Sequence, residues 1–385
     1  MEDSVAVLSP FQGSGERILI GIADYFRYNE CYEIRPYDLS REKIDITEIN
    51  QNHKACIFVD PTGKWFGRLD EITIPCVTVF QEDEGSLAAS ILVGDLEIGR
   101  LAAEHFHGRG FHHYGFAGRI DQTRMKTIYQ SFKESLDLDR YNLHLFSEKF
   151  PERMANSEEE DVKKSVFQYR LKTWLESLPK PVGVFVSDDW QCYEVYTCCK
   201  MLGLSVPEEV ALLGINDDPL ACRLATPNLT SIRLPFEKIG YEAGQTLASL
   251  IKGDSPQNRL IKPAGVVVRG STQTIAVEDE VVKKGLDFME RNSQKPIKVE
   301  DILDHIGVSR SMLERRFRAE LGRTPLVEMR RQRVERARSL LADSEFSIQK
   351  ISELSGFASN IRFTTVFGEQ VGMTPTEFRK AMLPS

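Results

Sequence analysis

Short apolar runs alternate with longer stretches of helical period along the chain as far as residue 275. The runs at 4–9, 54–60 and 75–80 predict buried strands, because a few consecutive apolar residues between turn signals are typical of parallel sheets. Apolar residues three or four positions apart, as at 15–29 and 95–110, predict amphipathic helices. Strands that alternate with helices in this way predict an α/β fold with parallel sheets covered on both faces.

The alternation continues through the middle of the chain and pauses at 226–235. Further strands are expected at 32–39, 112–118, 141–146, 183–189, 210–217 and 261–271. Further helices are expected at 122–136, 158–178, 190–204 and 236–253. From about Glu278 the strand signals end and only helical patterns remain, which places a domain boundary near 274–281.

The helical end contains the same pattern twice. Residues 299–319 predict a helix, a break at Gly307 and a second helix whose N-cap is Ser309. About fifty residues later the segment SIQKISELSGFASNIRFTTVFGEQ repeats this plan, with Gly356 at the turn. A helix, a tight turn containing glycine and a second helix form a helix-turn-helix motif. A strongly basic helix is expected between the two motifs, at 325–344.

In a helix-turn-helix motif, residues near the start of the second helix reach the base edges in the major groove. Asparagine and arginine pair bidentately with adenine and guanine, so Asn360 and Arg362 are candidates for reading bases. Serine, threonine and other basic side chains usually hold phosphates. The remaining DNA-binding candidates are Ser309, Arg310, Ser311, Arg315, Arg331, Ser359 and Thr364. The alternative is a helical bundle with a solvated basic face.

Charge separates the two parts of the chain. The formal net charge is −8, yet residues 280–385 carry 19 Lys and Arg against 15 Asp and Glu. The other residues carry 30 basic against 42 acidic side chains. An acidic body with a basic helical module suits a nucleic-acid-binding module attached to a separate domain.

The helical end resembles the C-terminal region of AraC-type transcription regulators. The resemblance covers residues 281–381 and is carried by GFASNIRFTTVFGEQVGMTPTEFR together with the upstream VSRSMLERRFRAELGRTPLVEMRRQRVERARSLL. It implies a module whose two recognition helices enter successive major-groove segments on one face of DNA. Two sets of residues echo each other as turns and caps: Gly322, Thr324 and Pro325 in the first half, and Gly372, Thr374 and Pro375 in the second.

In the acidic body, two apolar strands are followed directly by carboxylates or an amide. These stretches are VFVSDDW at 184–190 and LLGINDDP at 212–219. Polar groups at the carboxyl ends of parallel strands are where open α/β sheets bind ligands. Carboxylate and amide oxygens can accept the hydroxyl hydrogens of a sugar, and an indole such as Trp190 can stack on its apolar face. A polyol is therefore the predicted ligand class.

The body resembles the periplasmic-binding-protein-like effector domain of LacI-type repressors. The resemblance rests on DLEIGRLAAEHF at 95–106, FAG, VFVSDDW, and GINDDP followed by Thr-Pro-x-Leu-Thr-Ser-Ile at 226–232. It implies that Asp188 and Asn216 bind the ligand, while Asp189 and Asp217 cap or hold their loops. Tyr129 stands where the family has an arginine, so Arg119 or Arg124 is expected to supply that contact instead. From the other lobe, Asp60 at the end of the strand at 54–60 and Phe11 just past the first strand are the expected ligand contacts.

These carboxylates have other interpretations. An Asp directly after a strand is often the N-cap of the next helix, because its side chain accepts hydrogen bonds from the first backbone amides. Acidic pairs also occur in metal sites and as catalytic groups, but no nucleophile or histidine set accompanies them here. The seven cysteines form no CxxC pair and are expected to be free and mostly buried.

Together these features predict a two-lobed periplasmic-binding-protein-like α/β fold of type I, with parallel sheets, followed by an all-α domain with two helix-turn-helix motifs. The sugar-sensing domain is expected at 1–274, a linker at 275–281 and the DNA-binding domain at 282–385. The lobe boundaries are expected as follows: an N-lobe of 4–110 with 236–258, and a C-lobe of 111–235 with 259–274.

The two resemblances together imply a regulator that responds to a monosaccharide, a pentose such as xylose, and activates catabolic genes. Expected partners are double-stranded DNA with operator half-sites, the sugar and a second copy of the chain, with RNA polymerase a further candidate. No cofactor, metal or catalytic residue is expected. No apolar run approaches the ~20 residues of a membrane span, so the expected location is the cytoplasm. Alternatives are a repressor for another sugar and a sugar-handling enzyme with a helical tail.

Overall fold

The computed structural model describes most of the chain as two compact units. The described residues are 4–29, 32–39, 44–60, 66–81, 88–136, 142–150, 158–274, 276–277 and 279–382. The first unit comprises residues 1–95, 234–263 and 380–385, and the second comprises 96–233 and 264–379. Each unit contains one central sheet.

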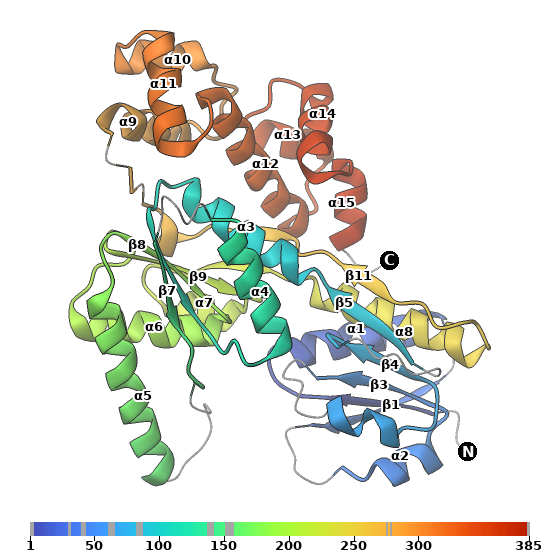
Figure 1. The fold of residues 1–385 in the computed structure, drawn as a ribbon. Coiled ribbons are helices and arrows are strands. Elements are labelled where there is room, and N and C mark those ends of the chain that lie inside the picture. Colours follow the sequence, from blue (N-terminus) through green and yellow to red (C-terminus); the bar gives the residue numbers. More distant parts are fainter. Residues whose placement is uncertain are drawn as a thin grey trace. The chain divides into compact units, whose positions relative to one another are not determined.

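The sheet of the first unit has the strand order β11-β5-β4-β3-β1-β2, and all of its pairings are parallel. Its strands are β1 (Ser4–Ser9), β2 (Glu33–Asp38), β3 (Ala55–Val59), β4 (Cys76–Val79), β5 (Ala88–Val93) and β11 (Arg259–Ile261). Its helices are α1 (Ser14–Asn29), α2 (Ile46–Asn52) and α8 (Phe236–Ile251), and a short 3₁₀ helix, η1, covers Phe66–Glu71. Figure 1 shows α1 and α8 running beside this sheet.

Helices α1 and α8 pack so closely that two glycines are required at their crossing. A Cβ atom on Gly21 of α1 would lie 1.8 Å from the carbonyl oxygen of Glu237 in α8. A Cβ atom on Gly240 of α8 would lie 2.0 Å from the carbonyl oxygen of Ile18 in α1. The ion pair between Arg17 and Glu237, at 2.9 Å, adds a polar contact to the same pair of helices. Because each added Cβ atom would overlap a backbone carbonyl of the other helix, only glycine fits at these two positions.

The sheet of the second unit has the order β12-β10-β9-β8-β6-β7, and its one antiparallel pairing joins β10 to β12. Its strands are β6 (His113–Ala117), β7 (Asn142–Phe146), β8 (Val182–Val186), β9 (Val210–Ile215), β10 (Thr230–Arg233) and β12 (Gly265–Val267). The helices of this part are α3 (Asp95–His107), α4 (Thr123–Glu134), α5 (Glu158–Ser177), α6 (Asp189–Leu202) and α7 (Pro219–Leu224). A 3₁₀ helix, η2, covers Gly270–Thr272.

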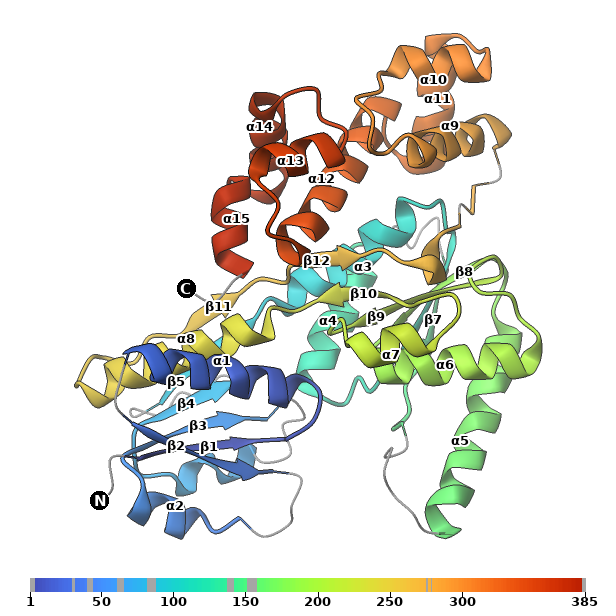
Figure 2. The ribbon, with the colours of Figure 1, turned by 180° about the vertical axis from the view of Figure 1, so that it is seen from behind.

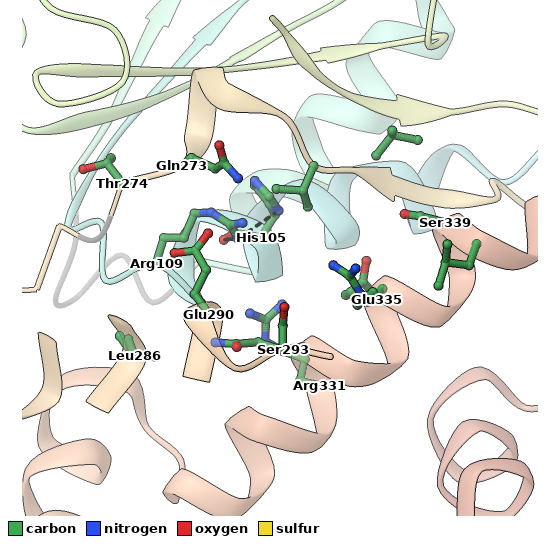
Figure 3. A pocket seen from close by; sticks show the side chains of 16 residues that line it. His105, Arg109, Gln273, Thr274, Leu286, Glu290, Ser293, Arg331, Glu335 and Ser339 are labelled. Carbon is green, nitrogen blue, oxygen red and sulfur yellow. Dashed lines mark hydrogen bonds between the residues drawn. The ribbon is translucent and has the colours of Figure 1, made fainter. Parts of the chain in front are cut away.

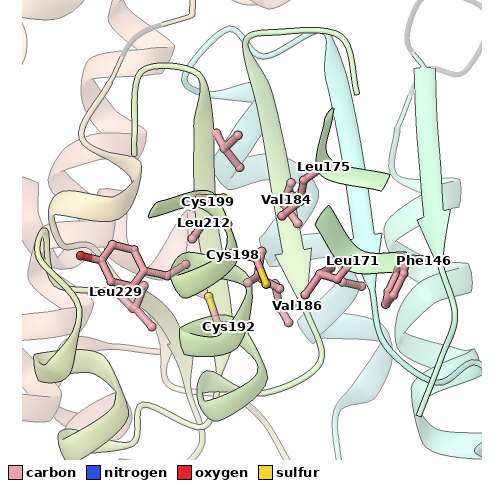
Figure 4. Packing of buried hydrophobic residues seen from close by; sticks show 14 of the residues in the cluster. Phe146, Leu171, Leu175, Val184, Val186, Cys192, Cys198, Cys199, Leu212 and Leu229 are labelled. Atoms are coloured by element: carbon pink, nitrogen blue, oxygen red, sulfur yellow. The ribbon is translucent and has the colours of Figure 1, made fainter. Parts of the chain in front are cut away.

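Helices α5 and α6 cover one face of this second sheet with fully buried apolar side chains. Leu171 and Leu175 of α5 and Cys199 of α6 meet Val184 of β8 and Leu212 of β9 in one core cluster (Figure 4). All five side chains are 0% exposed. The described cysteines are free and buried, as the sequence predicts.

The C-terminal region is entirely helical, and its helices are also labelled in Figure 2. They are α9 (Glu280–Arg291), α10 (Val299–Ile306), α11 (Arg310–Leu321), α12 (Pro325–Asp343), α13 (Ile348–Leu354), α14 (Asn360–Val371) and α15 (Pro375–Met382). One core joins α9, α10 and α11 through Leu286, Ile302 and Phe317. A second forms a chain of aromatic rings, Phe357, Phe363, Phe367 and Phe378, with successive centroids 5.0, 5.5 and 5.5 Å apart.

The structure confirms the predicted fold class of α/β lobes followed by a helical region. One local prediction is wrong: 261–271 is not one strand. The segment contains two short strands instead: β11 ends before Pro263 and β12 begins after it. The two strands belong to different sheets. The elements β5, β10, α2 and α7 were not predicted, and α9 and α15 were expected only as part of a helical region. Among the described residues, none of the helices combines the length and the apolar composition that crossing a bilayer requires.

Candidate functional site

The two predicted helix-turn-helix motifs are present and share one local design. Helix α11 begins after Ser309, whose Oγ accepts a hydrogen bond of 3.3 Å from the backbone N–H of Met312. Helix α14 begins after Ser359, whose Oγ accepts one of 3.3 Å from the N–H of Arg362. Both helices have twelve residues and both end at a glycine in the left-handed conformation. Serine caps and left-handed glycines fix where each helix starts and stops.

Most of the predicted DNA-binding residues lie exposed on the second helices of these motifs. Those exposed on α11 or at its cap are Ser309, Arg310, Ser311 and Arg315. Those exposed on α14 or at its cap are Ser359, Asn360, Arg362 and Thr364. The side chain of Arg310 bonds to Glu300 at 3.2 Å and to Glu314 at 3.3 Å. These are exposed ion pairs, which contribute little to stability.

Arg331 lies in a different environment. Its side chain is 18% exposed, and its guanidinium donates hydrogen bonds of 2.9 and 3.1 Å to the carboxylate of Glu328. This geometry gives Arg331 a structural role within α12. Its contact with DNA phosphate stays a prediction.

Glu328 is the centre of this polar cluster. Its carboxylate is fully buried and also accepts hydrogen bonds of 2.5 Å from Arg323 and 2.8 Å from Gln332. Burial by itself would raise the pKa of Glu328, but the attraction of Arg331 and Arg323 outweighs it and lowers the pKa to about 2. The carboxylate is therefore ionised and fully hydrogen-bonded, as a buried charge must be.

Within the second unit, α11 and α12 are hydrogen-bonded to the α/β lobe. The Nε2 atom of His107, at the end of α3, lies 2.9 Å from the carbonyl oxygen of Leu321. The guanidinium Nε of Arg338 donates to the carbonyl of Ala264 at 3.2 Å. A Cβ atom on Gly108 would lie 2.5 Å from the guanidinium of Arg331, so the backbone after α3 meets the Glu328 cluster directly.

Beside this contact lies a cavity of about 470 Å³ with mixed charge (Figure 3). His105 and Arg109 line it from the α/β lobe, and Glu290, Arg331 and Glu335 line it from the helical region. Burial lowers the pKa of Arg109 to about 10, and the nearby charge of Arg331 acts in the same direction. The lining is held together by polar contacts, such as that of the Arg109 Nε with the carbonyl of Thr272 at 2.7 Å.

The predicted ligand-binding residues of the second unit lie at the carboxyl ends of two adjacent strands. Asp188 follows β8, and Asn216 follows β9, which pairs with β8. Asp188 is also the N-cap of α6, since its Oδ1 accepts a hydrogen bond of 2.9 Å from the N–H of Gln191. Asn216 has a φ of 102°, an uncommon conformation for a residue with a side chain. Such backbone positions cluster at ligand sites.

The loops that carry these two residues are fixed by buried polar contacts. Asp217 accepts hydrogen bonds of 2.6 Å from Arg233 and 2.5 Å from Arg269. Asp189 is 1% exposed and accepts one of 2.7 Å from the N–H of Asp218. Burial raises the pKa of Asp189 well above its ordinary value. Both carboxylates hold their loops, as the family resemblance implies.

The other predicted ligand residues are more scattered. The indole Nε1 of Trp190 donates to the side chain of Asp218 at 3.2 Å, which turns the half-buried ring toward that loop. Arg119 is paired with Asp121 at 2.9 Å, and Arg124 lies in the first turn of α4. The half-buried ring of Tyr129 packs on the buried ring of Phe116, with centroids 5.1 Å apart.

Two further candidates belong to the first unit. Asp60 directly follows β3 and is 3% exposed, and Phe11 follows β1 and is 40% exposed. In the described residues, no group of three or more His, Cys, Asp or Glu side chains is placed to hold a metal ion. The ligand roles of these residues stay predictions.

Reasoning from the sequence missed two features of the site. The first is Glu328, which is fully buried on α12 between Arg331 of the same helix and Arg323 of the turn before it. The second is Ile361, which is 83% exposed on α14 between two predicted base-reading residues. The sequence could have predicted this exposure, because the helical period places Ile361 on the side of α14 opposite to Phe363 and Phe367.

Comparisons with known proteins agree with this architecture. A family model for a periplasmic binding protein-like domain matches residues 103–272, and one for a helix-turn-helix domain matches residues 302–381. The chain is 28% identical to the xylose operon regulatory protein of Haemophilus influenzae, over 94% of each chain. It is 34% identical to that of Escherichia coli K12 in a match that spans 55% of each chain. A solved structure described as the xylose-binding transcription activator xylR has the same fold, with a TM-score of 0.60, 23% identity and 98% of each chain covered.

The fold, the paired recognition helices and these matches define the class. The chain is a DNA-binding transcription regulator in which a periplasmic-binding-protein-like domain precedes an AraC-type helix-turn-helix domain. Within this class, it is a relative of the xylose operon regulatory proteins along nearly its whole length.

Proposed function

We propose that the protein is a sugar-responsive transcription regulator that activates genes for the catabolism of a pentose, xylose first among the candidates. The proposal rests on one observation: the candidate DNA-binding site and the candidate ligand-binding residues Asp188 and Asn216 lie in the same compact unit. This unit contains two capped, exposed recognition helices, and it also contains Asp188 and Asn216 at the carboxyl ends of adjacent strands. The names of the full-length relatives point to xylose.

Sugar binding acts by shifting a conformational equilibrium. A ligand moves such an equilibrium only by its differential affinity for the two states. Asp188 and Asn216 must therefore hold the sugar more tightly in the state that binds DNA. Asp60 and Phe11 of the first unit, Trp190, and one of Arg119 and Arg124 complete the proposed ligand contacts. The hydrogen bonds of α11 and α12 to the α/β lobe offer a path by which lobe movement reorients the recognition helices.

Two copies of the DNA-binding module, one from each chain of a dimer, bind double-stranded DNA together. A homodimer presents two modules to two operator half-sites, since the symmetry of a dimeric regulator matches the repeat of its operator. An activator bound in this way contacts RNA polymerase, and its place of action is the cytoplasm. The proposed domain boundaries are 1–274 for the sensor, 275–281 for the linker and 282–385 for the DNA-binding domain.

A gel-shift experiment tests this function. The full chain is mixed with the DNA upstream of its own gene and of neighbouring sugar genes, with and without each member of a pentose panel. We expect sequence-specific retention that one pentose changes strongly. Pentose turnover, or sugar binding with no specific DNA retention, would instead support a sugar-handling protein with a helical tail.

A further inference from the structure

Ile361 is the most exposed large apolar side chain of the described residues, at 83%. The buried side of α14 is formed by Phe363, Val366 and Phe367, which are 0, 5 and 0% exposed. At about 100° of rotation per residue, Ile361 projects from the side opposite to them. Isoleucine is also a poorer helix former than alanine, leucine or lysine. Neither packing nor helix propensity therefore explains an isoleucine at this position.

The residues one and two turns after Ile361 on its own face of α14 are uncharged. One turn later, Thr365 lies on the same face, and its Oγ1 donates to the carbonyl of Ile361 at 3.0 Å, so its hydroxyl already has a partner within the helix. A further turn on, a Cβ atom added to Gly368 would meet no atom within 4 Å. Glycine inside a helix costs about 1 kcal/mol relative to alanine. A residue of this kind allows another molecule to approach the helix backbone closely.

The position of Ile361 in the helix gives this face a specific partner. Ile361 is the second residue of α14, in the turn that reaches the base edges when a recognition helix enters the major groove. There the only apolar group on a base edge is the C5-methyl of thymine. We propose that Ile361 packs on the C5-methyl group of a thymine and makes the major-groove segment that α14 reads dependent on that base. This inference rests on the proposed binding of double-stranded DNA.

The matching face of α11 has the opposite chemistry. The two helices align cap to cap, so Ser311, Arg315 and Arg318 of α11 occupy the positions of Ile361, Thr365 and Gly368 in α14. Arginine pairs with guanine and with phosphates, but it gains nothing from a thymine methyl. At these three aligned positions the two recognition helices therefore favour different bases, and the contact of an isoleucine with a thymine methyl group is expected in the segment that α14 reads.

Replacement of thymine by deoxyuridine tests this contact, because the change removes only the methyl group. A preferred duplex is first selected from random-sequence DNA with the full chain. Each of its thymines is then replaced singly, and affinities are measured by fluorescence anisotropy. We expect at least one replacement to weaken binding of the wild type about fourfold, the value of one buried methyl group. Ile361→Ala should bind the unmodified duplex more weakly and show no loss at that position.

Two variants control the experiment. Ile20→Ala removes another exposed isoleucine, 48% exposed on α1, and should keep the wild-type profile. Ile361→Val keeps part of the contact and should show an intermediate loss, while both Ile361 variants should unfold at the wild-type temperature. If the wild type selects a duplex but Ile361→Ala keeps the same sensitivity to deoxyuridine, the contact is refuted and the regulator stands. If the wild type selects no duplex at all, the proposed function itself fails.

Discussion

Asp188 caps helix α6 and is also a proposed sugar contact, so a single substitution would not separate the two roles. Its carboxylate caps α6 through the N–H of Gln191, and it is the first of the proposed sugar contacts. Asp188→Ser keeps a capping oxygen but removes the carboxylate, whereas Asp188→Ala removes both. We expect both variants to lose sugar binding in calorimetry. Only Asp188→Ala should also lose about 1 kcal/mol of stability in urea unfolding, the usual value of an N-cap. Normal sugar affinity in Asp188→Ser would show that the carboxylate does not bind the ligand.

Loss of the Arg362 side chain should change base preference, whereas loss of the Arg331 side chain should reduce folding stability. Arg362 is exposed at the start of α14, so Arg362→Ala should relax base preference at one position, at a cost of about 1–3 kcal/mol on the specific duplex. Arg331→Ala removes a partner of the buried Glu328 carboxylate and should cost about 1–3 kcal/mol of folding stability. Competition binding on specific and random duplexes, with unfolding curves of both variants, separates the effects. Equal loss on every duplex for Arg362→Ala would exclude it as a base reader.

At the scale of elements, the sequence predicted the recognition helices better than the strands. Ser309 and Ser359 mark the starts of α11 and α14, and a glycine marks the end of each, so local chemistry fixes these helices. The four-residue β10 carries no such signal, and the apolar pattern at 261–271 did not show that two short strands, β11 and β12, replace one. Their residues become strands because a neighbouring strand pairs with them, which is information that a local pattern does not contain.

The crossing of α1 and α8 allows a clean test of packing. Gly21→Ala would place a methyl group against the backbone carbonyl of Glu237, which cannot rotate away as a side chain could. Forcing extra volume into a packed contact typically costs about 1–3 kcal/mol, and we expect at least that loss in chemical unfolding. Gly67→Ala is the matched control, because a Cβ atom there would meet nothing within 4 Å. Equal stability of the two variants would contradict the described helix contact.

At the scale of the whole molecule, the α/β lobe and the DNA-binding helices meet at residues that are far apart in sequence. His107 contacts Leu321, and Arg338 contacts Ala264. Each of these side chains looks like an ordinary surface residue in its own segment, so the sequence did not reveal this contact. The ligand-binding edge was easier to predict, because Asp188 and Asn216 each directly follow an apolar strand.

Two histidines, His107 at this contact and His105 beside it, should make the folding stability of the protein depend on pH. Burial lowers the pKa of His105 and of His107, and the charges of nearby arginines act in the same direction. In the unfolded chain both would have a pKa of about 6.5. The unfolded state therefore binds more protons below that pH, and these groups reduce stability as the pH falls. We expect His107→Gln to lose less stability than the wild type between pH 7 and pH 5. Parallel curves of unfolding free energy against pH would show that His107 does not titrate differently on folding.

The central claim is that a sugar held by Asp188 changes the affinity of the recognition helices for DNA. The most direct test is the dissociation constant of the full chain for its selected duplex, measured by fluorescence anisotropy with and without saturating D-xylose, for the wild type and for Asp188→Ser. Xylose should tighten binding by the wild type at least tenfold and leave Asp188→Ser unchanged. Equal wild-type affinity in the presence and absence of sugar, with calorimetry showing the sugar bound, would contradict the claim.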